Sequence, residues 1–128
     1  MLNYRFEELP QEKVDNNFIN HLVKQVSKAM NIDFFKDDVL LKQLQQHIPA
    51  MLSRLKHQTV VKNPFSEQIK LEYSITYNIL WLILEEILPH NISKINEDEN
   101  EFLTLYFQLS IEKLKKASKI NTIALELK

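Results

Sequence analysis

Histidine is the residue type in this sequence that is best suited to carry chemistry. The chain has four histidines, no cysteine and no glycine, which excludes disulfides, thiolate nucleophiles and glycine-rich phosphate-binding loops. His47 lies three residues after Leu44 and four before Met51, so it borders an apolar stripe at helical spacing. Two roles fit this place: a reactive side chain at the edge of the core, or a structural histidine hydrogen-bonded at its rim.

Arg54 follows His47 by seven residues, which is two turns along the same face of a helix. Because helical side chains lean toward the N-terminus, the Arg54 guanidinium can point toward the imidazole. Its planar fork offers paired donors to phosphate oxygens. The alternative is a surface arginine that caps a carbonyl or pairs with a carboxylate.

The other three histidines are given no role. His21 lies off the apolar face of its predicted helix, and His57 and His90 lie in or beside predicted loops. Their spacing matches no metal-binding motif such as H-x-x-x-H. We therefore expect neither a metal ion nor a cofactor.

Helices are the elements expected to position these side chains. The absence of glycine disfavours strand-rich folds, which need glycine in tight turns, and favours helices, whose interiors glycine destabilises. Apolar spacing predicts a first helix over residues 15–30 with Asn31 as its C-terminal cap, and a second over 37–56. Pro49 lies inside the second helix and predicts a kink or a break near residues 45–47.

The second half of the chain predicts three further helices. Residues 66–72 form a short one after the loop at Asn63. Residues 73–88 are apolar on almost every side, which predicts the central helix of a bundle or one half of a dimer contact. The last long helix begins in an acidic run and is expected to end in the lysine-rich run 113–119, with both charges matched to the helix dipole.

The acidic run is interpreted as a helix start and not as a carboxylate site. Its members are Glu97, Asp98, Glu99 and Glu101.

The totals are those of one soluble globular domain. The chain has 128 residues, of which 45% are hydrophobic and 26% charged, and its net charge is −1. This balance gives no reason to expect direct nucleic-acid binding. The longest apolar run, Ile79 to Leu84, is far shorter than the roughly 20 residues of a membrane-spanning helix, so we expect a cytoplasmic protein.

Together these features predict an all-α protein: about five helices in a compact antiparallel bundle, forming a single domain. Residues 15–120 are expected to form that domain. Residues 1–14 are expected to be a linker or the tail of a preceding element, and 121–128 a C-terminal tail.

Four segments, in this order, resemble the phosphotransferase-system regulation domain of bacterial antiterminators and sugar-operon activators. They are HIPAMLSRL at 47–55, KNPF at 62–65, EQIKLEY at 67–73 and EDENEFLTLYF at 97–107. The resemblance covers about residues 15–118. It implies a five-helix bundle that dimerises and serves as a regulatory domain, not an enzyme.

The resemblance also implies residue roles. His47 matches the first family histidine, which accepts a phosphoryl group from the system's phosphocarrier protein or from a sugar-specific component. Arg54 and Asn63 match the positions that follow it, as possible phosphate-binding or supporting groups. Tyr106 stands where the family has its second phosphoacceptor histidine, and tyrosine cannot replace histidine in that role. Asn100 stands where the family usually has an apolar residue.

Phosphorylation of His47 is then expected to alter dimer packing and so to control the parent transcription regulator. One alternative is a purely structural dimerisation domain that is never phosphorylated, which the loss of a histidine at Tyr106 favours. A second alternative is a nucleic-acid-binding helical domain, which would bind tightly and with strong salt dependence.

Overall fold

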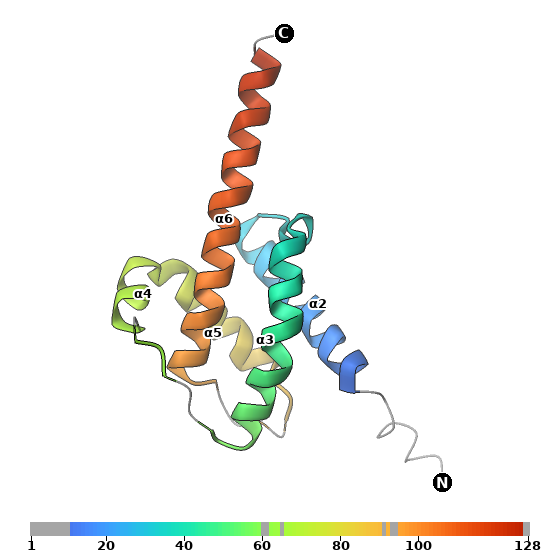
Figure 1. The fold of residues 1–128 in the computed structure, drawn as a ribbon, viewed down its shortest axis with the longest axis vertical. Coiled ribbons are helices and arrows are strands. Elements are labelled where there is room, and N and C mark those ends of the chain that lie inside the picture. Colours follow the sequence, from blue (N-terminus) through green and yellow to red (C-terminus); the bar gives the residue numbers. More distant parts are fainter. Residues whose placement is uncertain (1–10, 60–61, 65, 91, 93–94, 127–128) are drawn as a thin grey trace.

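The computed structural model describes residues 11–59, 62–64, 66–90, 92 and 95–126, and every regular element among them is helical. In chain order the elements are α2 (Gln11–Met30), the 3-10 helix η1 (Phe34–Lys36), α3 (Asp38–Lys56), α4 (Ser66–Glu72), α5 (Ser74–Ile87) and α6 (Glu97–Glu126). The prediction of one all-α domain of about five helices is confirmed (Figure 1). Only η1 was not predicted.

The expected terminal segments lie partly inside these helices. Residues 1–10 and 127–128 are outside the described residues. Residues 11–14 belong to α2 and residues 121–126 belong to α6.

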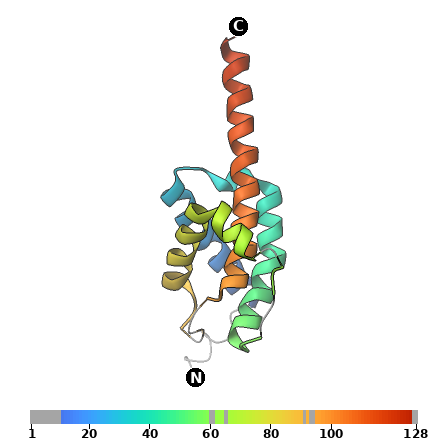
Figure 2. The same ribbon diagram turned by 90° about the vertical axis from the view of Figure 1, so that its left-hand side faces the viewer.

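α6 is the helix on which three of the other helices pack. It contacts α3, α4 and α5, while α2 packs against α3 and α5 (Figures 1 and 2). Fully buried apolar side chains fill the space between these helices. They include Leu22, Val23, Val26, Leu44, Ile48, Met51, Leu80, Leu84, Leu103 and Phe107. The ring of Phe34, from η1, meets that of Phe107 edge-on with 5.1 Å between centroids. The predicted stripes of α2 and α3 thus supply much of the core.

Two non-glycine residues end helices in the left-handed conformation that glycine usually supplies. Asn31 follows α2 and Gln58 follows α3, each with φ of 55°. Beyond Gln58, the N–H of Thr59 donates to the Arg54 carbonyl at 2.8 Å, which closes the last turn of α3. The prediction of Asn31 as a C-terminal cap is confirmed, and the absence of glycine is met by side chains that tolerate this conformation at some steric cost.

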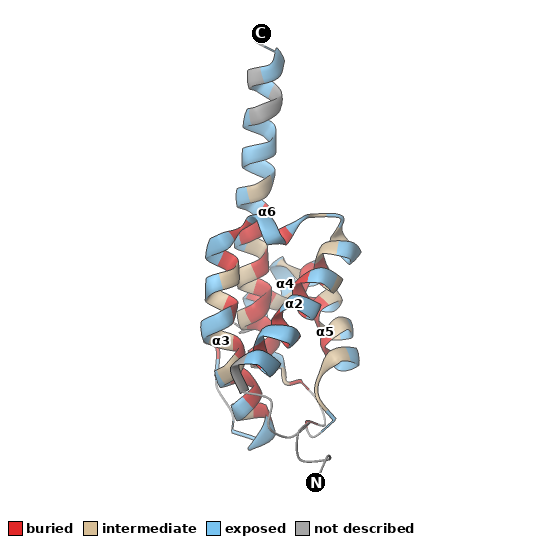
Figure 3. Ribbon diagram, turned by 90° about the vertical axis from the view of Figure 1, so that its right-hand side faces the viewer, coloured by how far each residue is buried: buried red, intermediate tan, exposed pale blue. Residues whose placement is uncertain are grey.

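Of the two places predicted for residues 73–88, the centre of the bundle is wrong for α5, whereas one half of a dimer contact stays a prediction. Ile75 and Leu82 are 72% and 66% exposed, and only the face bearing Thr76, Tyr77, Leu80 and Leu84 is buried (Figure 3). α5 packs between α2 and α6 and leaves its outer side uncovered. The central position belongs to α6.

The break predicted at Pro49 and the predicted end of the last helix both differ from the structure. α3 continues through Pro49 without a break, because the carbonyl that Pro49 cannot bond belongs to the exposed residue Gln45 and can be solvated. The kink that was the other outcome predicted there stays a prediction. α6 continues past its lysines to Glu126, since a basic run favours a helix end without enforcing one. Its last turns extend beyond the bundle (Figure 2).

Asp37 joins the start of α3 to α6. Its carboxylate accepts from the backbone N–H groups of Val39 and Leu40 at 3.2 Å, which caps the helix. The same Oδ1 accepts from Lys113 Nζ at 2.6 Å. Burial alone would raise the pKa of Asp37, but the bonds from Lys113 and the backbone more than offset it, so the pKa is lowered.

We expect Asp37→Asn to keep the cap and lose the ion pair, which lowers the free energy of unfolding by roughly 1 kcal/mol at pH 7. A lowered pKa means that the contribution is complete above the unfolded value near 4 and disappears as pH falls through the folded value. Urea unfolding of both proteins between pH 7 and pH 2 should show that the difference between their free energies of unfolding disappears at low pH. Asp38→Asn, at an exposed acid in the same turn, is the control, and a difference independent of pH would contradict the assignment.

Candidate functional site

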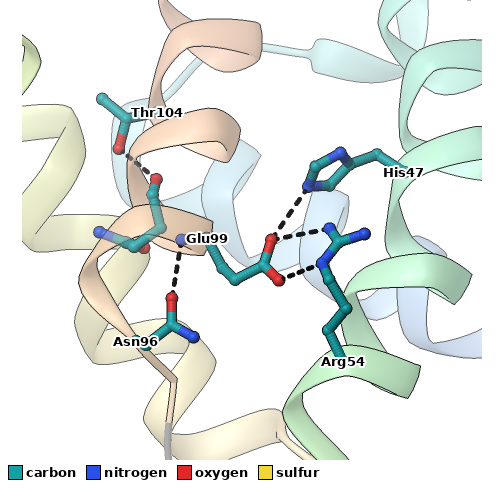
Figure 4. Close-up of polar contacts among 6 residues, drawn as sticks. His47, Arg54, Asn96, Glu99 and Thr104 are labelled. Carbon is teal, nitrogen blue, oxygen red and sulfur yellow. Dashed lines mark hydrogen bonds and ion pairs between the residues drawn. The ribbon is translucent and has the colours of Figure 1, made fainter. Parts of the chain in front are cut away.

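A buried carboxylate lies at the centre of the polar contacts around His47. Glu99, in the first turn of α6, has no exposed surface. Its backbone N–H donates to Asn96 Oδ1 at 2.9 Å, so Asn96 caps the start of α6. The Glu99 side chain points from α6 toward α3, where it meets His47 and Arg54 (Figure 4).

Arg54 binds this carboxylate through both arms of its fork. Its Nε donates to Oε2 at 2.7 Å and its Nη2 donates to Oε1 at 2.9 Å. The Arg54 side chain is 27% exposed, whereas that of Glu99 is fully buried. Two parallel charge-assisted bonds are the strongest way to compensate a buried carboxylate, and here they join residues 45 positions apart in the chain.

The pair remains ionised at neutral pH. Burial would raise the pKa of Glu99, but the hydrogen bonds and charge of Arg54, with a contribution from His47, more than offset burial and the pKa is lowered. The bond to Glu99 raises the pKa of Arg54 despite partial burial. Glu99 therefore presents a negative charge to its surroundings.

His47, on α3, is the third member of the cluster. Its Nε2 lies 3.5 Å from Glu99 Oε1, the oxygen that also accepts from Arg54 Nη2. Nε2 is shielded from solvent, and 3.5 Å is longer than a well-formed hydrogen bond. The side chain as a whole is 14% exposed, so the ring lies at the rim of the core, as the apolar stripe predicted.

Aromatic rings of α6 fix the plane of the imidazole. Tyr106 meets it edge-on with 5.4 Å between centroids, and Phe102 lies tilted against it at 5.7 Å. Tyr106 therefore lies in direct contact with His47. An arrangement of this kind holds one ring orientation and leaves one edge of the ring toward solvent.

The structure brings together three of the four predicted site residues. Arg54 reaches the neighbourhood of the imidazole by binding Glu99, so the structure shows the carboxylate partner that was the alternative for it, and phosphate binding by Arg54 stays a prediction. Asn63 lies on the loop before α4, where its backbone N–H donates to Asp98 Oδ1 at 3.0 Å. Asn63 thus supports the start of α6 beside the cluster.

Glu99 was missed as a site residue. The acidic run does begin a helix, as predicted, but Glu99 and Glu101 within it are buried. One signal was available: Glu99 precedes Leu103 by four residues and Tyr106 by seven, so it lies on the core-facing side of α6. A charged residue at such a position needs a partner of opposite charge, and Arg54 is the one with the matching helix face.

Asn100 is accommodated by a specific bond. It is fully buried, and its Nδ2 donates to the Tyr77 carbonyl of α5 at 3.0 Å. The amide group thus joins α5 and α6 by a hydrogen bond, while its Oδ1 is buried and accepts no bond from the described residues.

Within the described ranges, no group of three or more His, Cys, Asp or Glu side chains is placed to hold a metal ion. Of the helices described, none combines the length and apolar character needed to cross a bilayer.

Comparison with known families identifies the domain. The model of the PRD domain matches residues 20–110. The chain belongs to this family of phosphotransferase-system regulation domains, and that membership gives it a regulatory role.

The relatives found are longer proteins. "Transcriptional regulator ManR" of Bacillus subtilis (strain 168) is 33% identical over 112 residues, which cover 88% of this chain and 17% of that protein. "Protein GlcT" of Staphylococcus epidermidis is 28% identical over 120 residues, which cover 87% of this chain and 43% of that protein. The chain therefore spans less than half the length of either relative. No solved structure matches it.

We expect Arg54→Met to lower the free energy of unfolding by about 3 kcal/mol, because it leaves the Glu99 charge buried and unpaired. Lys70→Met is the matched control: Lys70 pairs with Glu97 at 3.3 Å, but the two side chains are 42% and 58% exposed. That variant should lose less than about 1 kcal/mol. Urea unfolding at pH 7 measures both, and equal losses would show that the buried pair has no special weight.

Proposed function

We propose that this chain is the regulatory domain of a cytoplasmic sugar-operon transcription regulator, an activator or an antiterminator, and that His47 is its phosphate-accepting residue. The donor is a phosphohistidine protein of the phosphotransferase system, either the phosphocarrier protein or a sugar-specific component. The domain is then a substrate and a switch, and neither an enzyme nor itself a nucleic-acid-binding module.

The observation that carries this proposal is the place of His47 in the cluster. Its ring stands at the rim of the core, oriented by Glu99, Phe102 and Tyr106, and partly open to solvent. Neutral imidazole is a nucleophile at cytosolic pH. The name of the ManR relative, a transcriptional regulator, supports the same class of parent protein.

The cluster supports a physical route from phosphate to regulation. A phosphoryl group adds about −1.5 to −2 charges. On either ring nitrogen of His47, this charge would lie no farther than across the imidazole from the Glu99–Arg54 pair, so that through space it repels the carboxylate and attracts the guanidinium. The added charge thus competes with the ion pair that joins α3 to α6. A change in the packing of these two helices is the means by which a homodimer would respond to phosphorylation.

A second candidate function is a structural dimerisation domain that is not phosphorylated. The observation that favours it is the apolar outer face of α5, where Ile75 and Leu82 lie seven residues apart and largely exposed. Tyr106, at the position of the second family histidine, also favours it. The phosphorylation assay below separates the two functions.

We expect acid-labile label on the domain after incubation with phosphoenolpyruvate, the general phosphotransferase enzyme and the phosphocarrier, with and without a sugar-specific component. His47→Ala should abolish the label because it removes the acceptor nitrogen. His21→Ala, at an exposed histidine on α2, is the matched control and should label normally. A wild-type domain left unlabelled by the complete cognate system would favour the structural function, and label that survives in His47→Ala would place the acceptor elsewhere.

A further inference from the structure

The two nitrogens of the His47 ring lie in different environments. Nε2 faces the Glu99 carboxylate at 3.5 Å and is shielded from solvent. Nδ1 points to the other side of the ring, away from that carboxylate (Figure 4). Among the described residues, Nδ1 meets no hydrogen-bond partner and is not one of the shielded, unpartnered side-chain atoms. The open edge of the ring is therefore the Nδ1 edge.

The charge opposite Nε2 determines where the ring carries its proton. An ionised carboxylate only accepts hydrogen bonds, and a neutral imidazole carries one N–H and one lone pair. Glu99 is ionised because Arg54 binds both of its oxygens. The proton of neutral His47 is therefore favoured on Nε2, and the lone pair is left on Nδ1.

We propose that Glu99 is the positioning residue of this site and that it makes Nδ1, not Nε2, the nitrogen of His47 that accepts phosphate. This inference rests on the function proposed above and specifies its chemistry. Shielding and proton placement act together, because Nε2 is both covered by protein and occupied by its proton, while Nδ1 has an electron pair and an open approach.

The transfer balances without a further reactant. The Nδ1 lone pair forms a bond to the phosphorus of the donor phosphohistidine, the donor P–N bond breaks, and its electron pair returns to the donor imidazole. No proton needs to leave His47 during the transfer, since the Nε2 proton remains opposite the Glu99 carboxylate. That carboxylate stabilises the positive charge that the ring gains as the new bond forms.

The experiment is heteronuclear NMR of the full chain with 15N-labelled histidine, before and after phosphorylation by the complete system. Before phosphorylation, the ring signals of neutral His47 should report the Nε2–H tautomer. Afterwards, 31P–15N coupling should place phosphorus on Nδ1. Phosphorus on Nε2, or an Nδ1–H tautomer in the unmodified protein, overturns the inference while leaving phosphorylation of His47 intact. Absence of any label on His47 instead overturns the proposed function, and the inference with it.

The variant Glu99→Gln tests the role of the charge. The glutamine amide has one acceptor oxygen, which would accept from the charged Arg54 guanidinium. Its NH2 group would then face His47 and favour the Nδ1–H tautomer. We expect the initial phosphorylation rate to fall by roughly tenfold or more, as when a carboxylate that sets a histidine tautomer is replaced by its amide. Glu97→Gln makes the same change at an exposed position of the same turn and should label at the wild-type rate.

Circular dichroism and the Tyr106 ring signals establish whether Glu99→Gln is folded. A folded variant with a wild-type rate and Nδ1 product would show that Glu99 does not position the ring. If the variant does not fold, the tautomer and the phosphorus position in the wild-type chain decide the inference alone.

Discussion

The fully buried carboxylate of Glu99 is the group that constrains how the helices of this domain pack. A buried ionised group is tolerated only when paired and hydrogen-bonded, and the partner here, Arg54, comes from another helix 45 residues away. The pair therefore fixes how the end of α3 meets the start of α6. The same carboxylate oxygen faces His47, so the requirement that stabilises the fold also orients the candidate phosphate acceptor.

α3 and α6 run antiparallel, and ion pairs join them near both ends of α3. Asp37, before α3, binds Lys113 in α6, while Arg54, near the end of α3, binds Glu99 at the start of α6. His47 lies between these two ion pairs, against Phe102 and Tyr106. Charge added at His47 would thus act on the contact between two helices and not on an isolated surface side chain, which is what a regulatory switch requires.

Local sequence patterns were enough to predict the helices and the position of His47 at the edge of the core. Apolar spacing indicated the stripes of α2 and α3, Asn31 as a cap, and the place of His47 at the rim. The prediction of α5 as the central helix was wrong because periodicity does not show which faces neighbours cover, and Leu82 remains exposed. Glu99 was missed because the partner that makes a buried acid tolerable lies far away in sequence. Its role depends on tertiary contacts, whereas helix spacing is local.

Glu99 is buried and yet kept ionised by Arg54, which titration of the Glu99 side-chain carboxyl by 13C NMR tests directly. We expect the pKa of this carboxyl to lie below the ordinary value of a glutamate, because the hydrogen bonds and charge of Arg54 outweigh burial. In a folded Arg54→Met protein the pKa should rise above that value, since burial then acts without compensation. A wild-type carboxyl whose pKa lies at or above the ordinary value, or that titrates alike in both proteins, would show that Arg54 does not keep Glu99 ionised.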